Sequence, residues 1–295
     1  MSFKFNNNRI QKPKRVVILG SSGIISNNLQ KLLKEKNINV FTIGKAKFDL
    51  RNGNTAQALS SKIRTTDSVV FISAEAPVKN IRMFINNLKI CNTVCDSLEK
   101  KKIKHLIYIS SDAVYADVKE NISEKTVTSP SSLHGLMHLT REEILKDNFN
   151  KILCILRPTL IYGTGDSHNG YGPNRFVNCA LRNNSISIFG SGEERRDHIF
   201  IEDLVKIIVQ CIEKKGLGIL NLASGKVFSF KYLAKLVINS SKSKSKLIKI
   251  KRKGPMPHNG YRPFDVTLLK NSFKNIKISS IKIGIKKYLI SLDKQ

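Results

Sequence analysis

Short runs of apolar residues alternate along the chain with longer stretches in which apolar residues recur every three or four positions. The short runs have the length and composition of buried strands, and the longer stretches have the period of helices. This order predicts an α/β fold, a doubly wound parallel sheet with helices on both faces. The strands are expected at residues 15–19, 39–43, 68–72, 105–109, 152–156 and 218–222.

Between the strands, helical spacing marks three helices, which carry Ile25 to Leu33, Val78 to Lys102 and His134 to Lys146. The alternation weakens beyond about residue 166, where glycine, proline and asparagine cluster. We therefore expect a main domain at residues 14–166, to which residues 196–224 return, and a smaller C-terminal α+β region at residues 167–295.

The net charge of the chain bears on which partners it could bind. The 295 residues include 51 Lys and Arg but only 22 Asp and Glu, which gives a formal net charge of +29. Such an excess suits a nucleic acid or an anionic membrane, yet the basic residues are spread along the whole chain instead of forming one stripe. We therefore attribute the positive charge to a genome-wide preference for lysine, and we keep nucleic-acid binding as an alternative explanation. A basic surface would also attract a substrate that carries phosphate.

The sequence pattern indicates neither a membrane segment nor a metal site. No apolar run approaches the roughly 18 to 20 residues that cross a bilayer, and the basic residues 1–15 are unlike a signal peptide. We expect a cytoplasmic protein without a membrane partner. The five cysteines contain no Cys-x-x-Cys pair, so Cys91 and Cys95 are expected to be reduced and buried, with no metal bound.

A glycine-rich turn follows the first expected strand. Gly20 allows a tight turn, Gly23 allows a ligand to approach closely, and the turn leads directly into the first helix. Backbone N–H groups at such a helix N-terminus bind the pyrophosphate of a dinucleotide. We therefore expect a dinucleotide to bind at Gly20, Ser22, Gly23 and Ile24.

The end of the second strand distinguishes NAD from NADP. An acidic residue there binds the 2′-hydroxyl of the ribose, whereas a basic residue accepts the 2′-phosphate of NADP. The strand ends in Gly44 and Lys45, and the nearest acidic residue is Asp49. The cofactor is therefore expected to be NAD or NADP, with a slight preference for NADP. Lys45, Asp49 and Ala74 complete the expected cofactor site.

Five further motifs occur in an order that resembles the extended short-chain dehydrogenase/reductases of the NAD-dependent epimerase/dehydratase family. The resemblance covers nearly the whole chain and implies a dinucleotide-binding Rossmann domain followed by a region that mainly binds substrate. The motifs are Ser110 to Tyr115, Leu156 to Asp166, Gly190 to Leu204, Asn221 to Gly225 and Arg262 to Val266.

The resemblance also implies roles for single residues. Ser111 would hydrogen-bond the reacting hydroxyl of a nucleotide-linked sugar, and Asp112 would contact the substrate. Arg196 and Arg262 would clamp the diphosphate, a role that suits the fork of a guanidinium. Members of the family are often dimers through two helices of each subunit, so we expect a homodimer.

The family motif Tyr-x-x-x-Lys, which carries the chemistry, is replaced in this chain. His134 and His138 occupy its two positions, and Glu142 keeps the glutamate that follows. A tyrosine, with a pKa of about 10, needs a nearby cation to lose its proton, whereas a histidine starts at about 6.5 and does not. We therefore expect His134 to move the proton and His138 to assist.

A loop rich in His, Asn, Tyr and Arg, residues 166–176, is expected to contact the substrate through His168 and Asn174. The main hypothesis is hydride transfer that epimerises, dehydrates or reduces a nucleotide-linked sugar. One alternative is a catalytically inactive, dinucleotide-binding regulatory protein on the same fold. The other is a basic nucleic-acid-binding protein.

Overall fold

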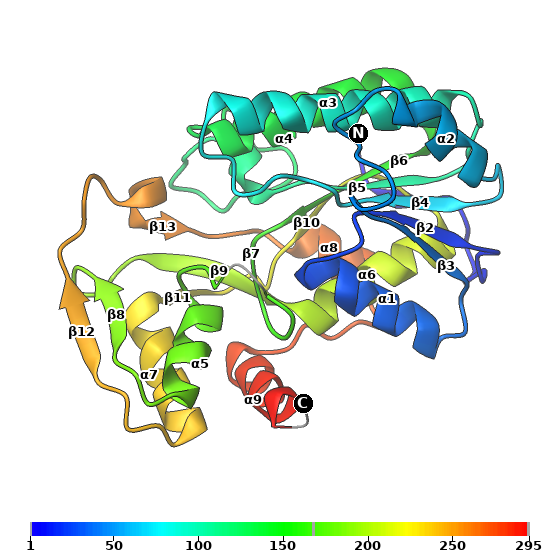
Figure 1. Cartoon of the computed structure of the whole chain (residues 1–295). Helices are drawn as coiled ribbons and strands as arrows, with labels where there is room; N and C mark the ends of the chain where they lie inside the picture. Colours follow the sequence, from blue (N-terminus) through cyan, green and yellow to red (C-terminus); the bar gives the residue numbers. More distant parts are fainter. Residues whose placement is uncertain (1, 167–168, 294–295) are drawn as a thin grey trace.

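The computed structural model describes residues 2–166 and 169–293 and contains a larger and a smaller region (Figure 1). The sheet of the larger region comprises β1 (Lys4–Phe5), β2 (Val16–Leu19), β3 (Val40–Ile43), β4 (Ser68–Phe71), β5 (Leu106–Ile109), β6 (Leu153–Pro158) and β10 (Gly216–Leu222). These strands lie in the order β1-β10-β6-β5-β4-β2-β3. All pairs are parallel except that between β1 and β10.

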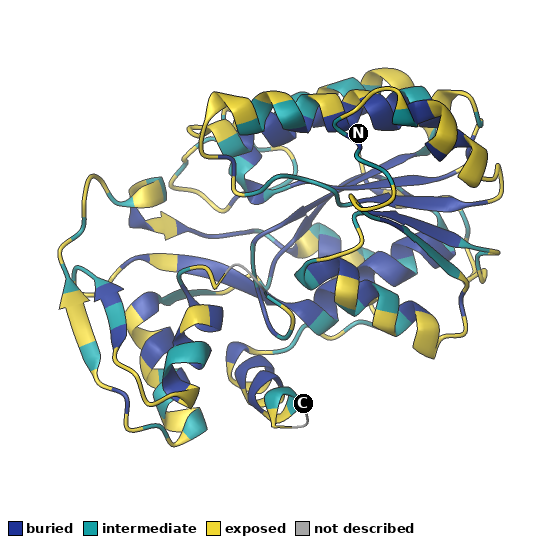
Figure 2. Cartoon of the chain, viewed as in Figure 1, coloured by how far each residue is buried: buried dark blue, intermediate teal, exposed yellow. Residues whose placement is uncertain are grey.

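Helices cover both faces of this sheet. On one face, α2 (Thr55–Lys62), α3 (Ile81–Glu99) and α4 (Leu133–Phe149) enclose one apolar core, and on the other face α1 (Ile24–Glu35) and α6 (Ile201–Lys214) enclose a second. Side chains of β2, β4, β5 and β6 point alternately into the two cores, so these strands are buried on both sides (Figure 2). The predicted doubly wound α/β fold is confirmed.

The smaller region contains two further sheets. In one of them, β9 (Arg195–Phe200) pairs with β7 (Leu160–Tyr162), β11 (Val227–Ser229) and β13 (Tyr261–Arg262). The other is formed by β8 (Ile186–Phe189) and β12 (Leu247–Ile250). This region also contains α5 (Pro173–Leu181), α7 (Phe230–Ser241) and α9 (Ile281–Leu292), whereas α8 (Thr267–Ser272) packs against β10 of the main sheet. The segment 196–224 is therefore divided, because β10 joins the main sheet beside β6 whereas β9 lies in the second sheet.

The first residues of the chain complete the main sheet, which the sequence pattern did not indicate. β1 pairs with β10, and Phe3 and Phe5 pack against Phe273 with ring centroids 5.8 and 5.2 Å from it. Two aromatic residues within a short basic segment show neither a strand nor a helix period. The edge strand therefore becomes recognisable only once its partner strand is known.

Buried polar contacts fix α4, the helix that carries both candidate histidines, against the sheet. Glu142 is fully buried, and its carboxylate accepts hydrogen bonds from Ser110 Oγ at 2.5 Å and from Arg157 Nε at 2.9 Å. Arg141, also buried, donates to the backbone oxygen of Asn87 in α3 at 3.0 Å. These charge-assisted bonds hold α4 in one orientation on β5 and β6 and against α3.

Replacing Glu142 with alanine is expected to lower the free energy of unfolding by about 3 to 5 kcal/mol, because Arg157 would remain buried and charged without its partner. Glu143→Ala is the matched control, since the Glu143 side chain is 62% exposed and bonds Lys146 at the surface. Its removal should change that free energy by about 0.5 kcal/mol or less. Urea unfolding followed by circular dichroism measures both variants, and equal losses would contradict the assignment.

Candidate active site

The turn between β2 and α1 has the geometry of a phosphate-binding turn. Gly20 has a φ of +118°, and a Cβ atom there would lie 3.0 Å from the backbone nitrogen of Ser73. Gly23 has a φ of +98° and precedes the first residue of α1, whose N-terminus is not capped by a described side chain. Apart from Gly23, its chain neighbours and the adjoining helix backbone, no described atom lies within 4 Å of a Cβ position on Gly23. A ligand can therefore approach the N–H groups of the helix, and these residues fit the pyrophosphate of a dinucleotide.

A cavity of about 180 Å³ opens beside this turn. Five of the residues that we expected to bind the cofactor line it, namely Gly20, Ser22, Lys45, Asp49 and Ala74. The other two, Gly23 and Ile24, lead from the turn into α1. The structure brings the expected residues together in one place, and their role in cofactor binding stays a prediction.

Arg51 also lines this cavity, and the sequence analysis missed it. Its Nε donates to Asp49 Oδ1 at 2.8 Å, and its Nη1 lies 3.3 Å from Glu75 Oε1. The hydrogen bonds from Arg51 lower the pKa of Asp49 to about 2. Asp49 is therefore hydrogen-bonded by Arg51, whereas Lys45, which also lines the cavity, has an exposed side chain. Arg51 follows Asp49 in an irregular loop, where no periodic pattern could single it out.

Ser111 follows the carboxyl end of β5, the end at which parallel sheets bind ligands. Its Oγ accepts a hydrogen bond from the N–H of Ala113 at 3.1 Å and so caps the 3₁₀ helix η1 (Asp112–Val114). Gly135 of α4 lies directly against this turn, since a Cβ atom there would come within 2.0 Å of Ala113 O. Glycine at this position is what allows the start of α4 to approach the Ser111 turn.

His134 and His138 contact each other on one face of α4, with their rings edge to face and the centroids 4.8 Å apart. His138 is buried, and its Nδ1 lies 2.8 Å from the hydroxyl oxygen of Tyr108 in β5. His134 is partly buried, and its Nδ1 lies 3.5 Å from the backbone nitrogen of Val78, at the outer limit of a hydrogen bond. Tyr108 is a partner that the sequence analysis missed, because its side chain reaches α4 only in the folded chain.

The surroundings of the two imidazoles favour their neutral forms. Burial lowers the pKa of His134 and lowers that of His138 well below its ordinary value. The carboxylate of Asp112 opposes this shift at His134, whereas the guanidinium of Arg141 adds to it at both rings. Both imidazoles are therefore neutral at neutral pH.

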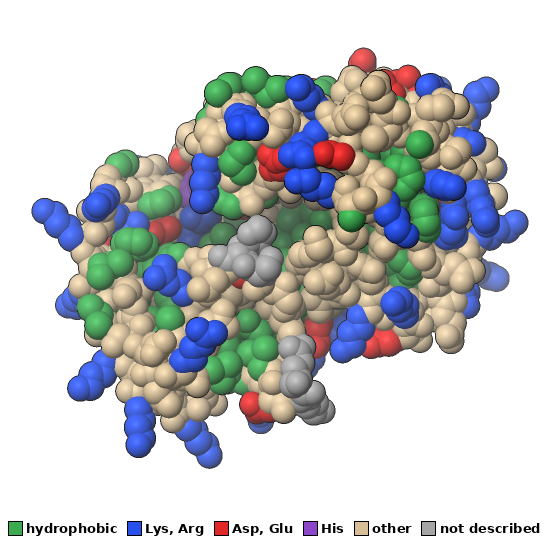
Figure 3. All heavy atoms as spheres, in the orientation of Figure 1, with side chains coloured by type: hydrophobic (Ala, Val, Ile, Leu, Met, Phe, Trp, Pro, Cys, Tyr) green, Lys and Arg blue, Asp and Glu red, His purple; other side chains and the backbone are tan. Residues whose placement is uncertain are grey.

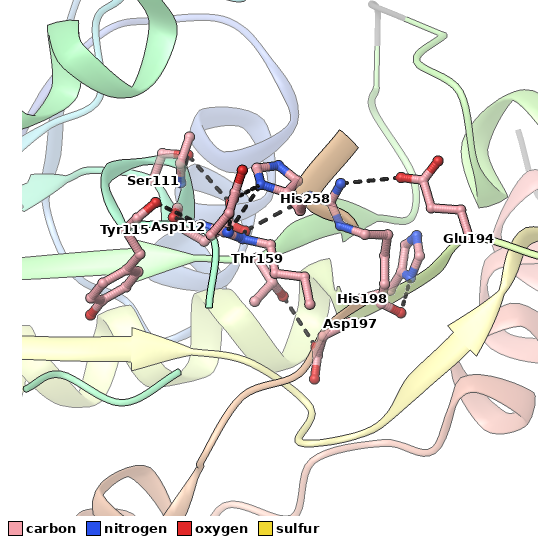
Figure 4. Close-up of polar contacts among 12 residues, drawn as sticks. Ser111, Asp112, Tyr115, Thr159, Glu194, Asp197, His198 and His258 are labelled. Carbon is pink, nitrogen blue, oxygen red and sulfur yellow. Dashed lines mark hydrogen bonds and ion pairs between the residues drawn. The ribbon is translucent and has the colours of Figure 1, made fainter. Parts of the chain in front are cut away.

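Asp112 and Arg262, both expected to contact the substrate, contact each other in the site shown in Figure 4. Arg262 Nε donates to Asp112 Oδ2 at 3.0 Å and its Nη1 donates to Asp117 Oδ1 at 2.9 Å, and the side chain is only 1% exposed. Arg196 has looser contacts, 3.4 Å to Glu194 and 3.9 Å to Asp112. Of the two arginines, Arg196 is therefore the one that a bound anion could recruit at lower cost.

Asn174 is the second residue of α5, and its amide bonds two described residues that precede the helix, Gly163 and Asp166. Its Oδ1 accepts a hydrogen bond from the N–H of Gly163 at 2.9 Å, and its Nδ2 donates to Asp166 Oδ2 at 2.8 Å. Asn174 also lines a second cavity of about 180 Å³. His168, which we expected to contact the substrate from the same loop, lies outside the described residues.

Two wider features bear on the possible partners. Within residues 2–166 and 169–293, no three His, Cys, Asp or Glu side chains are grouped so that they could hold a metal ion, and no helix is both long and apolar enough to span a membrane. Lys and Arg side chains are distributed over both regions on the face shown in Figure 3, without gathering into one stripe.

Relatives in sequence carry the names of nucleotide-sugar enzymes. The chain is 25% identical to the uncharacterized UDP-glucose epimerase YtcB of Bacillus subtilis over 234 residues, which are 69% of this chain and 74% of that protein. It is 23% identical to the dTDP-D-glucose 4,6-dehydratase of Dictyostelium discoideum, over 78% of this chain and 57% of that protein.

Solved structures share the fold over almost the whole chain. The UDP-glucose 4-epimerase of Thermotoga maritima, solved with UDP-glucose, has a TM-score of 0.85 and 19% identity and covers 95% of this chain and 99% of its own. MoeE5, solved with UDP-glucose and NAD, has a TM-score of 0.80, 16% identity and the same coverage. A GDP-L-fucose synthetase of Naegleria fowleri bound to NADP has a TM-score of 0.82 and 12% identity and covers 100% of this chain and 97% of its own.

The family model that matches the chain is that of the NAD dependent epimerase/dehydratase family, and it matches residues 16–223. The matched segment begins with β2 and ends just after β10, so it includes the glycine turn, Ser111 and the whole of α4. It spans more than half of the chain. The protein therefore belongs to the NAD dependent epimerase/dehydratase family, as its sequence motifs predict.

Proposed function

We propose that the protein is an NAD(P)-dependent enzyme that transfers hydride between a nicotinamide ring and a carbon atom of a nucleotide-linked sugar, giving epimerisation, dehydration or reduction. One short segment, residues 73–78, carries this proposal. Ser73 and Ala74 line the dinucleotide cavity, and the backbone nitrogen of Val78 faces His134. The segment therefore connects the lining of the cavity to the residue that faces His134, and this connection supports the proposal.

Ser111 would hydrogen-bond the reacting oxygen of the sugar. Its Oγ already accepts the N–H of Ala113, and its own hydrogen has only a 3.5 Å contact to Asp112 Oδ1. A contact of that length is weak, so the hydroxyl can donate to a hydroxyl or carbonyl oxygen of a substrate instead. The bound dinucleotide would supply the hydride acceptor and donor.

His134 would take the proton from the sugar hydroxyl during oxidation and return it during reduction. Its lowered pKa keeps the imidazole in the neutral form, which is able to accept a proton. His138, held by Tyr108, contacts the ring of His134 and would keep it in place. A neutral imidazole needs no neighbouring cation to act, which explains why tyrosine and lysine could be replaced together.

The substrate diphosphate would bind near Arg196, and the expected homodimer would form through α3 and α4. Arg196 is the less firmly held of the two expected arginines, while Arg262 would position Asp112. On the helices, Ile81, Ile85 and Leu136 are 63%, 46% and 43% exposed, which suits burial against a second copy.

One observation favours the alternative of an inactive, dinucleotide-binding regulator. His138 occupies the position at which the family has its lysine, yet it is buried and bonds Tyr108 in the core. A residue engaged in that way is well placed to support the fold. If the protein binds NAD or NADP but converts no nucleotide-sugar, the alternative of an inactive regulator is supported.

The proposed preference for NADP predicts a specific effect of Lys45→Asp. This change should weaken NADP binding relative to NAD about tenfold or more, because attraction to the 2′-phosphate would become repulsion. Lys47→Asp makes the same change of charge in the same exposed loop, but Lys47 does not line the cavity. This variant should leave the ratio of the dissociation constants for NADP and NAD unchanged. Calorimetric titration with each cofactor measures both constants. An equal loss for NAD and NADP in Lys45→Asp would contradict the preference.

His134→Phe is expected to reduce turnover of the substrate at least about 100-fold, because proton transfer would lose its acid–base group. Cofactor affinity should stay within about twofold of the unchanged protein. His138→Phe is the companion variant and should reduce turnover less, since its role would be to position His134. Transient NAD(P)H absorbance with a panel of nucleotide-sugars follows the reaction. Full turnover by His134→Phe would remove His134 from the mechanism.

The proposed base also predicts the pH dependence of kcat/KM. Burial disfavours the imidazolium and lowers the pKa of His134, so kcat/KM should fall only at a pH below the ordinary histidine pKa of about 6.5. Asp112→Asn removes the negative charge that opposes this pKa shift, so the pH at which kcat/KM falls should become still lower. In His134→Tyr that pH should become alkaline, because a phenol loses its proton only at alkaline pH. If kcat/KM falls at the same pH in both variants as in the unchanged protein, the assignment of His134 is contradicted.

A further inference from the structure

His198 in β9 is a buried histidine with one nitrogen engaged and one unengaged. The residue is 3% exposed, and its Nδ1 lies 3.2 Å from the backbone oxygen of Arg196 (Figure 4). A carbonyl oxygen can only accept a hydrogen bond, so Nδ1 carries the hydrogen of the ring. Burial lowers the pKa of His198 to about 3, which leaves the ring neutral. Nε2 therefore presents a lone pair and acts as an acceptor.

This acceptor has no hydrogen-bond partner among the described residues. His198 lines the second cavity of about 180 Å³, together with Tyr171, Gly172 and Asn174. A Cβ atom on Gly172 would lie 3.6 Å from Nε2, in van der Waals contact with it, so this lining residue of the cavity lies directly beside the nitrogen. A buried acceptor without a partner is costly and rare in folded proteins.

The neighbouring polar groups of the cavity are directed elsewhere. Asn174 Nδ2 donates to Asp166, and the hydroxyl oxygen of Tyr171 accepts the N–H of Phe189 at 3.1 Å. The ring of Phe230 meets His198 edge to face, with centroids 5.8 Å apart. His198 Nε2 is therefore an acceptor of the cavity lining without a partner among the described residues, and it would attract an O–H or N–H group and repel a phosphate oxygen.

We infer that His198 Nε2 accepts a hydrogen bond from a hydroxyl group of the bound nucleotide-linked sugar, and that this cavity is the subsite that recognises this hydroxyl. The inference rests on the proposed function. It adds that analogues lacking the hydroxyl bind more weakly, because the nitrogen then stays unpaired.

Binding of UDP-glucose and its monodeoxy analogues tests the subsite. In the unchanged protein, removal of one particular hydroxyl, on the hexose or the ribose, should weaken binding about three- to tenfold. In His198→Phe the same removal should have no effect. His105→Phe is the matched control, because His105 is equally buried, bonds Gly216 O through Nε2 at 3.0 Å and also has an unpartnered nitrogen, Nδ1, away from this cavity. This control should keep the discrimination. Equal penalties in His198→Phe and the unchanged protein for every analogue would overturn the inference.

Nitrogen-15 NMR of the unchanged, histidine-labelled protein supplies a test that needs no variant to fold. His198 should show a protonated Nδ1 and an unprotonated Nε2, and UDP-glucose should shift the Nε2 signal. Failure of every nucleotide-sugar to bind would reject the proposed function and the inference that rests on it. Binding of UDP-glucose that shifts the Nε2 signal supports the inference, whereas binding that leaves the signal unmoved overturns the inference and leaves the proposed function standing. A protonated Nε2 also overturns the inference.

Discussion

The buried ion pair between Glu142 and Arg157 is the contact on which the candidate active site depends. A charged pair in the core is stable only while each ion keeps its partner. If α4 shifted along β6, Glu142 and Arg157 would separate, and each would remain buried as an unpaired charge. Glu142 lies about two helical turns from His134, and fixing it fixes the imidazoles relative to β5. Gly135 then allows the first turn of the helix to meet Ala113.

The same packing determines the charge of the imidazoles. The close contact of α4 with the sheet buries His138 against Tyr108 and holds Arg141 beside both rings. Desolvation and the nearby guanidinium both disfavour the imidazolium. A helix that packed more loosely would leave His134 with an ordinary pKa, so the basicity of this residue is a consequence of tertiary structure.

The features that could be predicted from the sequence are those that depend on local residue patterns. The strands of the main sheet other than β1 follow from apolar runs, the turn at Gly20 follows from glycine spacing, and all of them are present. The long helix begins at Ile81 instead of Val78, because the side chain of Asn80 accepts the N–H of Met83 and caps it there. Arg51 at Asp49 and Tyr108 at His138 could not be predicted, since each pairing depends on where folded side chains point.

In the proposed function, the contacts of Asp112 would link substrate binding to the proton affinity of His134. Asp112 raises the pKa of His134, while the guanidinium groups of Arg262 and Arg196 share its carboxylate. Arg262 is buried and firmly bonded, whereas Arg196 is 3.9 Å away. A diphosphate that drew Arg196 away from Asp112 would leave the carboxylate less neutralised and able to hold an imidazolium more strongly. His134 would then become a stronger base at the moment when the sugar hydroxyl arrives beside it.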